Sequence, residues 1–161
     1  MCPDRRSPSG FAVVPQDAYG RYQGGGWTWG KTDYAGNAAI MPGQGGVRAD
    51  RWLQLKDVTD GLSNTLFVGE KAADPTVQTP ESWYWDEPYF LGGSGGTVRD
   101  GLGLAQIAVG SRYKNNWGSL HPGGVTFLAG DGSVRLLSYQ TDWHLFAALL
   151  TPAKGESETI P

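Results

Sequence analysis

The residues best suited to chemistry lie in the stretch from His121 to Ser138. His121 comes just before an apolar run, and Asp131 follows it ten residues later. A histidine and an aspartate can act as an acid–base couple or as two metal ligands. However, Asp131-Gly132 is the dipeptide that a two-residue type I′ hairpin turn requires, and this places Asp131 at a hairpin tip, a full strand away from His121. We therefore predict that His121 is a turn histidine that bonds a backbone carbonyl or a nearby carboxylate.

A second candidate is Ser94, at the centre of Gly92-Gly-Ser-Gly-Gly96. This segment satisfies the G-x-S-x-G pattern of a nucleophile elbow, which needs a strand before it, a helix after it, and then an acid and a histidine. The residues from Thr97 to Gly101 show no helical pattern, and the chain contains 25 glycines. A flexible loop is the preferred interpretation, so we predict no catalytic residue and no enzyme.

An oxygen-rich group could suggest a calcium site: Asp57, Asp60, Ser63, Asn64 and Glu70. Calcium takes six to eight oxygen ligands, often from one acidic loop, and the EF-hand spacing is not met here. We expect the two aspartates to cap backbone groups and the asparagine to form a turn. Calcium binding stays open as an alternative, while no cofactor is expected.

The single cysteine and the two histidines are too few and too scattered for a structural zinc site. Cys2 is the only cysteine, so no internal disulfide can form. A structural zinc ion needs four ligands, and His121 and His144 are far apart in the chain. His144 falls in the first turn of a predicted helix, and we expect it to be a partly buried surface residue.

The aromatic residues leave two interpretations open. Large rings can form the core of a glycine-rich fold with few leucines and isoleucines, which we prefer. Exposed coplanar rings would instead stack on sugars, as in a carbohydrate-binding module. The seven tryptophans are Trp27, Trp29, Trp52, Trp83, Trp85, Trp117 and Trp143.

The composition limits the domain organisation and the partners. A chain of 161 residues matches one domain, which we place at residues 1–161 with a flexible tail at 153–161. The formal net charge is −3, so no basic surplus favours nucleic acid. No apolar run is long enough for a transmembrane helix, and we expect no membrane contact by this chain.

Two kinds of element are predicted to position these residues. Residues 65–70 have the composition of a strand, and residues 125–138 form a hairpin that pairs Ala129 with Val134, Phe127 with Leu136 and Val125 with Ser138. Residues 57–61 indicate a short helical turn that ends at glycine. A C-terminal helix follows, with Asp142 as N-cap, an apolar stripe of Trp143, Phe146, Ala147 and Leu150, and an end at Pro152. The fold class is α+β, with a glycine-rich antiparallel sheet.

Three segments together resemble a known family. They are Cys2 to Pro8 (CPDRRSP) with Thr32 to Asn37 (TDYAGN), then Asp57 to Lys71 (DVTDGLSNTLFVGEK), then Ser119 to Ser138 (SLHPGGVTFLAGDGSVRLLS). In this order they are similar to the planctomycete-type domain of unknown function that follows a prepilin-type cleavage and methylation signal.

This resemblance implies a pilin-like globular head, the C-terminal body of a longer protein whose signal and long hydrophobic helix precede it. It further implies an extracytoplasmic location, in the periplasm or at the cell surface, and a structural, non-catalytic role. The expected partners are other pilin-like subunits or components of a type II secretion system. The alternative is a secreted surface module that binds a glycan or calcium.

Overall fold

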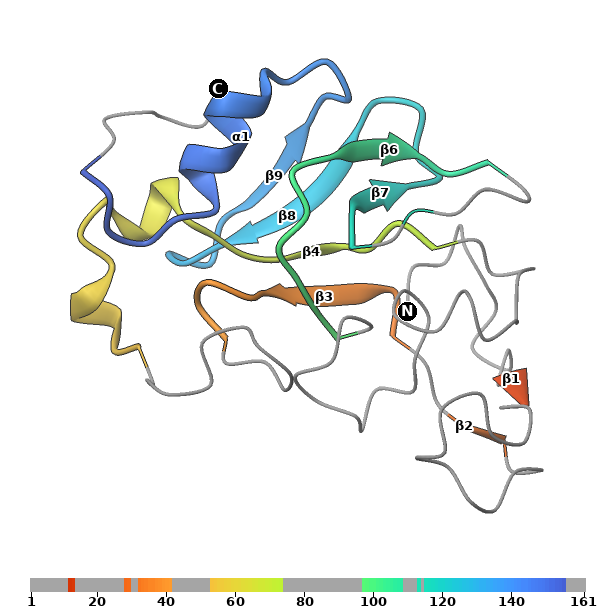
Figure 1. Cartoon of the computed structure of the whole chain (residues 1–161), viewed down its shortest axis with the longest axis horizontal. Helices are drawn as coiled ribbons and strands as arrows, with labels where there is room; N and C mark the ends of the chain where they lie inside the picture. The colour runs from red at the N-terminus through yellow and green to blue at the C-terminus, as the bar shows by residue number, and fades with distance from the viewer. Residues whose placement is uncertain are drawn as a thin grey trace.

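The described part of the chain is a mixed α+β fold that consists mostly of sheet (Figure 1). The computed structural model describes residues 12–13, 28–29, 32–41, 53–73, 97–108, 113 and 115–155. The strands are β1 (Ala12–Val13), β2 (Thr28–Trp29), β3 (Tyr34–Asn37), β4 (Leu66–Glu70), β5 (Val98–Arg99), β6 (Leu104–Gln106), β7 (Trp117–Ser119), β8 (Val125–Ala129) and β9 (Val134–Leu137). The helical elements are the 3₁₀ helices η1 (Leu55–Asp57) and η2 (Leu62–Asn64), and the α-helix α1 (Trp143–Leu149).

A five-stranded sheet in the order β5-β3-β4-β8-β9 forms the centre of the fold. The predicted strand at residues 65–70 is confirmed as β4, in the middle of this sheet. The prediction of an antiparallel sheet holds for β3–β4, β4–β8 and β8–β9, but β3 and β5 are parallel. The strands β6 and β7 form a separate parallel pair, and β1 and β2 an antiparallel pair.

The C-terminal hairpin is confirmed, but its predicted register is wrong by one residue. Phe127 lies opposite Arg135, not Leu136, and Val125 lies opposite Leu137. The reason is the loop: the Gly132 amide donates to the Ala129 carbonyl, and Gly132 has a φ of 87°. This is a three-residue loop that ends in a left-handed glycine, not a two-residue turn.

The register shift changes the face on which each β9 side chain lies. Leu137 is buried, whereas Leu136, predicted to face the core, is exposed. Phe127 is buried as predicted.

The C-terminal helix is also confirmed, with Asp142 as its N-cap. The Asp142 carboxylate accepts hydrogen bonds from the backbone N–H groups of His144 and Leu145, and the backbone N–H of Leu145, ahead of that of His144, lowers the pKa of Asp142. The predicted stripe is wrong at its first residue, because Trp143 is 56% exposed. Phe146 and Leu150 of the predicted stripe are buried, but Ala147 is only partly buried, and Ala148 and Leu149 complete the buried face. The buried face is therefore rotated from the predicted one.

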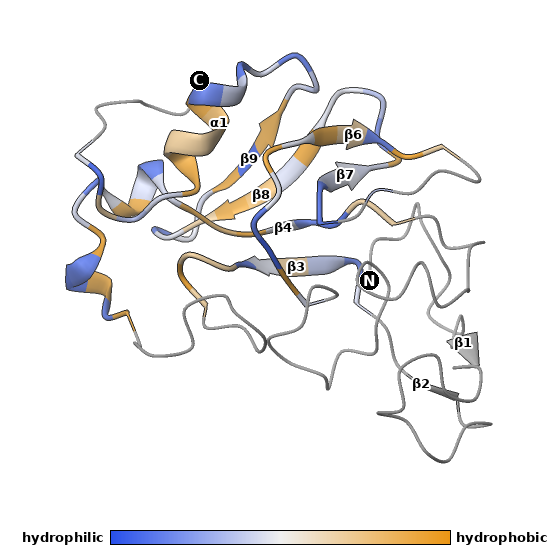
Figure 2. Ribbon diagram, viewed as in Figure 1, coloured by the Kyte–Doolittle hydropathy of each residue, from blue (hydrophilic) through white to orange (hydrophobic). Residues whose placement is uncertain are grey.

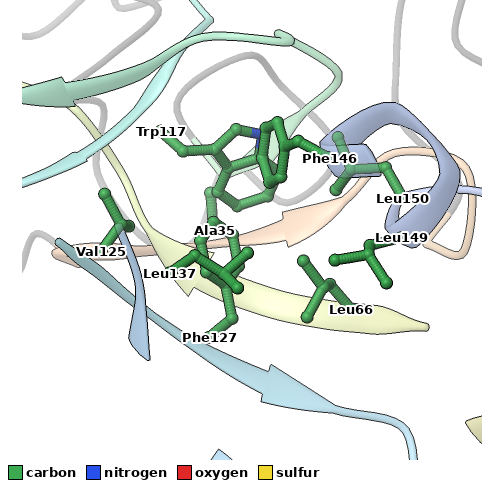
Figure 3. Close-up of a cluster of buried hydrophobic side chains, with 9 residues drawn as sticks. All are labelled: Ala35, Leu66, Trp117, Val125, Phe127, Leu137, Phe146, Leu149 and Leu150. Carbon is green, nitrogen blue, oxygen red and sulfur yellow. The ribbon is translucent and has the colours of Figure 1, made fainter. Parts of the chain in front are cut away.

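The core lies between the sheet and α1. Parts of β8, β9 and α1 are orange in Figure 2, which marks apolar residues on these elements. Figure 3 shows the nine buried side chains of this cluster, which are Ala35, Leu66, Trp117, Val125, Phe127, Leu137, Phe146, Leu149 and Leu150. The Phe127 ring lies 5.3 Å from that of Trp117 and 5.6 Å from that of Phe146, measured between ring centroids. Gly69 makes room for this stack, because a Cβ there would clash with Phe127 and Trp117.

The short helical turn predicted at residues 57–61 is displaced. The chain forms η1 just before it and η2 just after it, with Gly61 at a φ of 96° between them. Glycine tolerates a positive φ, and Gly61 is the N-cap of η2, whereas η1 already ends at Asp57 with Val58 as its C-cap.

Candidate functional site

Within the described residues, the side chains best suited to acid–base chemistry are Glu70 and His121. They meet where β4 stops pairing with β8 and the chain continues toward β7, a point called here the division of the sheet. The β4–β8 ladder ends at the pair Gly69–Phe127, and the next part of the chain turns to β7 through a bridge between Lys71 and Trp117. The Thr126 amide therefore has no β4 carbonyl opposite it. The Glu70 carboxylate takes that place and accepts the Thr126 N–H at 2.8 Å through Oε2.

His121 is the second partner of this carboxylate. Its Nε2 lies 3.3 Å from Glu70 Oε1, and the His121 side chain is 33% exposed while that of Glu70 is 2% exposed. The prediction that His121 bonds a nearby carboxylate is confirmed, and the carboxylate belongs to Glu70, 51 positions earlier in the chain, not to Asp131.

Tyr139 and Ser119 fix the backbone around His121. The Tyr139 hydroxyl donates to the His121 carbonyl at 2.6 Å and lies 3.1 Å from the Ser119 carbonyl. The His121 amide donates to Ser119 Oγ at 3.1 Å. Burial, and then the negative charge of Glu70, raise the pKa of Tyr139, so the hydroxyl stays a neutral donor.

Through Glu70, this arrangement joins β4, β8 and the loop before β8. Both oxygens of Glu70 are engaged, one with His121 and one with Thr126. Ser119 is fully buried, and its hydroxyl meets the His121 backbone amide. A serine nucleophile would instead have to meet the imidazole of the histidine.

Asp131 and His144 have local partners. Asp131 Oδ1 accepts the Ser133 amide at 2.8 Å, and the side chain and the backbone of Ser133 lower the pKa of Asp131. The His144 ring stacks on Trp143 with 3.5 Å between centroids. The prediction of a partly buried His144 is wrong, because the helix turns it to solvent.

The three carboxylates of the group proposed for calcium are engaged in different parts of the fold. Asp57 accepts the Gln54 amide at 3.0 Å, which closes the first turn of η1. Asp60 accepts the amides of Lys154 and Gly155, at 2.8 and 2.9 Å, and so holds the start of the predicted tail. The capping role of these two aspartates is confirmed, and Glu70 lies at the division of the sheet. Within the ranges that the structure describes, no three His, Cys, Asp or Glu side chains gather as a metal site would require.

Several predicted residues are not described by the structure. Cys2, Ser94, residues 156–161 and the tryptophans Trp27, Trp52, Trp83 and Trp85 lie outside the described residues, and only the backbone of Trp29 is described. Of the others, Trp117 is part of the core, as preferred from the sequence, and Trp143 is not.

The sequence analysis missed two buried polar residues that tie elements together. Asn37 Nδ2 donates to the carbonyls of Leu66 and Leu150, at 2.8 and 2.7 Å, and so links β3 to β4 and to the end of α1. Arg99 is buried and donates to the carbonyls of Ala72 and Asn116. An asparagine directly after Ala35 and Gly36 at the end of a strand was the available signal for the first, and Arg99 had none.

Comparison with known proteins defines the class to which this fold belongs. The mixed α+β domain matches the family model described as "protein of unknown function (DUF1559)" over residues 1–144 of 161. The chain therefore belongs to the DUF1559 family. No curated protein and no solved structure matches it. The helices of the described ranges are all too short or too polar to span a bilayer.

Proposed function

We propose that this chain is the extracytoplasmic body domain of a pilin-like or pseudopilin-like protein, with a role in assembly and not in catalysis. The observation that carries the proposal is that the Glu70–His121 pair makes structural contacts between elements of the fold. This is the arrangement best suited to acid–base chemistry, and it joins β4, β8 and the loop before β8. Both oxygens of the Glu70 carboxylate bind other parts of the chain and so link these elements.

The positions of the family-like motifs support the same proposal. The segment Asp57 to Lys71 contains η2 and β4, and the segment Ser119 to Ser138 contains β8 and β9. These motifs form the middle of the central sheet and the hairpin next to it. Their polar members Asp60, Glu70 and His121 bind other parts of the chain, which is what a scaffold requires of them.

The partners and the location follow from the resemblance of these motifs to prepilin-type proteins. We propose that the domain is exported by an N-terminal signal upstream of Met1. The partners would be other pilin-like subunits or components of a type II secretion system.

The test is the maturation of the full-length gene product in its own host. The protein would be isolated from the cell-surface, periplasmic and cytoplasmic fractions, and its N-terminal peptide identified by mass spectrometry. We expect an extracytoplasmic protein whose mature N-terminus is a methylated residue upstream of Met1. A cytoplasmic protein that begins at Met1 would refute the proposal.

A second candidate function, glycan binding, is favoured by one observation. Trp143 is more than half exposed at the start of α1, with its ring stacked on His144. An exposed indole can stack on the face of a sugar. Binding to an oligosaccharide array that Trp143→Ala abolishes would support this function, and equal binding by both proteins would exclude Trp143 as the site.

A further inference from the structure

The free edge of β9 is the surface that the described part of the chain leaves most open to another strand. This strand is the last in the order β5-β3-β4-β8-β9. The Ala129 amide donates to the Ser133 carbonyl, and the pairs Phe127–Arg135 and Val125–Leu137 follow at intervals of two. Hydrogen-bonded pairs alternate in an antiparallel ladder, so the main-chain groups of Val134 and Leu136 point away from β8.

Val134, Arg135 and Leu136 of this strand are open to solvent, and two of them are apolar. Val134 is 65% exposed and Leu136 is 58% exposed. Leu128, which lies opposite Val134 on β8, is exposed as well. Natural proteins usually protect an edge strand with a bulge, a proline or several charges, and an edge left unprotected is a template for an added strand.

Arg135 decides which kind of strand fits. If two copies of β9 paired about a two-fold axis, Val134 would lie opposite Leu136, and Arg135 would lie opposite its own copy. Like charges directly opposite each other destabilise a strand pair. If the pairing were shifted toward Gly132, it would include residues of the hairpin loop, which are not extended. If it were shifted toward Ser138, it would include the turn after β9, where the Thr141 amide donates to the Ser138 carbonyl. The edge therefore disfavours a second copy of itself and favours a strand with an acidic residue opposite Arg135.

We propose that the β9 edge accepts an extended segment of a different protein chain, in which an acidic residue stands between two apolar ones. Main-chain hydrogen bonds to Val134 and Leu136 would provide the attachment, and the pairing of the acidic residue with Arg135 would provide the selectivity. This inference rests on the proposed assembly function, since it names the surface by which the body domain meets a partner subunit.

The test uses two synthetic peptides, Ser-Thr-Val-Glu-Val-Thr-Ser and its counterpart with lysine in place of glutamate. Each is titrated into the isotopically labelled chain, and backbone amide shifts are followed by NMR. We expect the glutamate peptide to shift the amides of residues 134–137 and to bind about two- to fivefold more tightly than the lysine peptide. Arg135→Glu should reverse this preference.

A matched pair of variants separates the edge from general hydrophobic binding. Leu136→Lys should weaken both peptides, whereas Leu55→Lys, at a leucine of similar exposure (62%) on η1, should leave binding unchanged. Equal binding of the two peptides to the wild-type chain and to Arg135→Glu would overturn the inference. So would self-association of the wild-type chain that Leu136→Lys abolishes.

The same variants distinguish this inference from the proposed function. If the full-length Leu136→Lys protein is exported and assembles like the wild type, the edge is not the assembly surface, and the proposed function stands. If the wild-type protein is not exported, the proposed function fails whatever the peptides show.

Discussion

Replacing Glu70 by alanine should destabilise the fold more than any substitution of an exposed charged residue, because Glu70 is the acceptor at the division of the sheet. The variant leaves the partly buried Thr126 amide without its partner. A hydrogen bond to a charged group contributes about 1.5–3 kcal/mol, and the pair with the partly exposed His121 adds up to about 1 kcal/mol. We therefore expect the free energy of unfolding to fall by about 2–4 kcal/mol, a large share of a typical total of about 5–15 kcal/mol.

The assay is urea unfolding followed by far-ultraviolet circular dichroism at neutral pH. Glu70→Gln serves as the matched control, because it keeps one oxygen acceptor for the Thr126 amide while it removes the charge and replaces the other oxygen by an NH2 group. It should cost about 1–2 kcal/mol, and His121→Asn about 1 kcal/mol or less. The reasoning is refuted if Glu70→Gln costs as much as Glu70→Ala, or if Glu70→Ala costs less than about 0.5 kcal/mol, the range of ordinary surface changes.

Three further predictions concern other buried contacts. Gly69→Ala should lower the free energy of unfolding by about 1–3 kcal/mol in a thermal melt, because the new Cβ meets the Phe127 ring; an unchanged melting temperature would contradict this. Asn37→Ala should cost about 2–3 kcal/mol in urea, since the amide makes three hydrogen bonds, and a loss below about 1 kcal/mol would show that they are dispensable. The pKa of Tyr139 is raised above 10.0 by burial and the charge of Glu70, so the folded chain holds this proton more tightly than the unfolded chain. Stability should therefore be complete below pH 10 and fall as pH rises through the folded pKa. Tyr139→Phe should flatten this fall above about pH 10, and an unchanged profile would refute the assignment.

The hairpin and the helix of the C-terminal half could be predicted from the sequence, but the face that each buries could not. The hairpin was identified from Asp131-Gly132, but its register depended on which of two leucines faces inward. Leu136 and Leu137 are equally apolar, so the pattern could not choose between them, and the three-residue loop did. The helix offered two overlapping apolar stripes in the same way, and packing against Phe127 selected the one that leaves Trp143 exposed.

The Glu70–His121 pair could be predicted only in part. The type of interaction was foreseen, a turn histidine beside a carboxylate, but the partner was not. Glu70 lies 51 positions before His121, and the two meet because β4 stops pairing with β8 one residue earlier. No local pattern encodes where one strand leaves another, since that point is set by the packing of Trp117 and Phe127 around Gly69.

Cross-linking of the full-length protein in intact cells tests the central claim most directly. A membrane-impermeant cross-linker would be added to cells that carry either the wild-type gene or the His121→Asn variant, and the size and composition of the cross-linked species measured. An assembly domain predicts large extracytoplasmic species that contain other pilin-like subunits, in equal amount for both proteins at temperatures where both are folded. A protein that stays monomeric, or that the cross-linker cannot reach, would contradict the account.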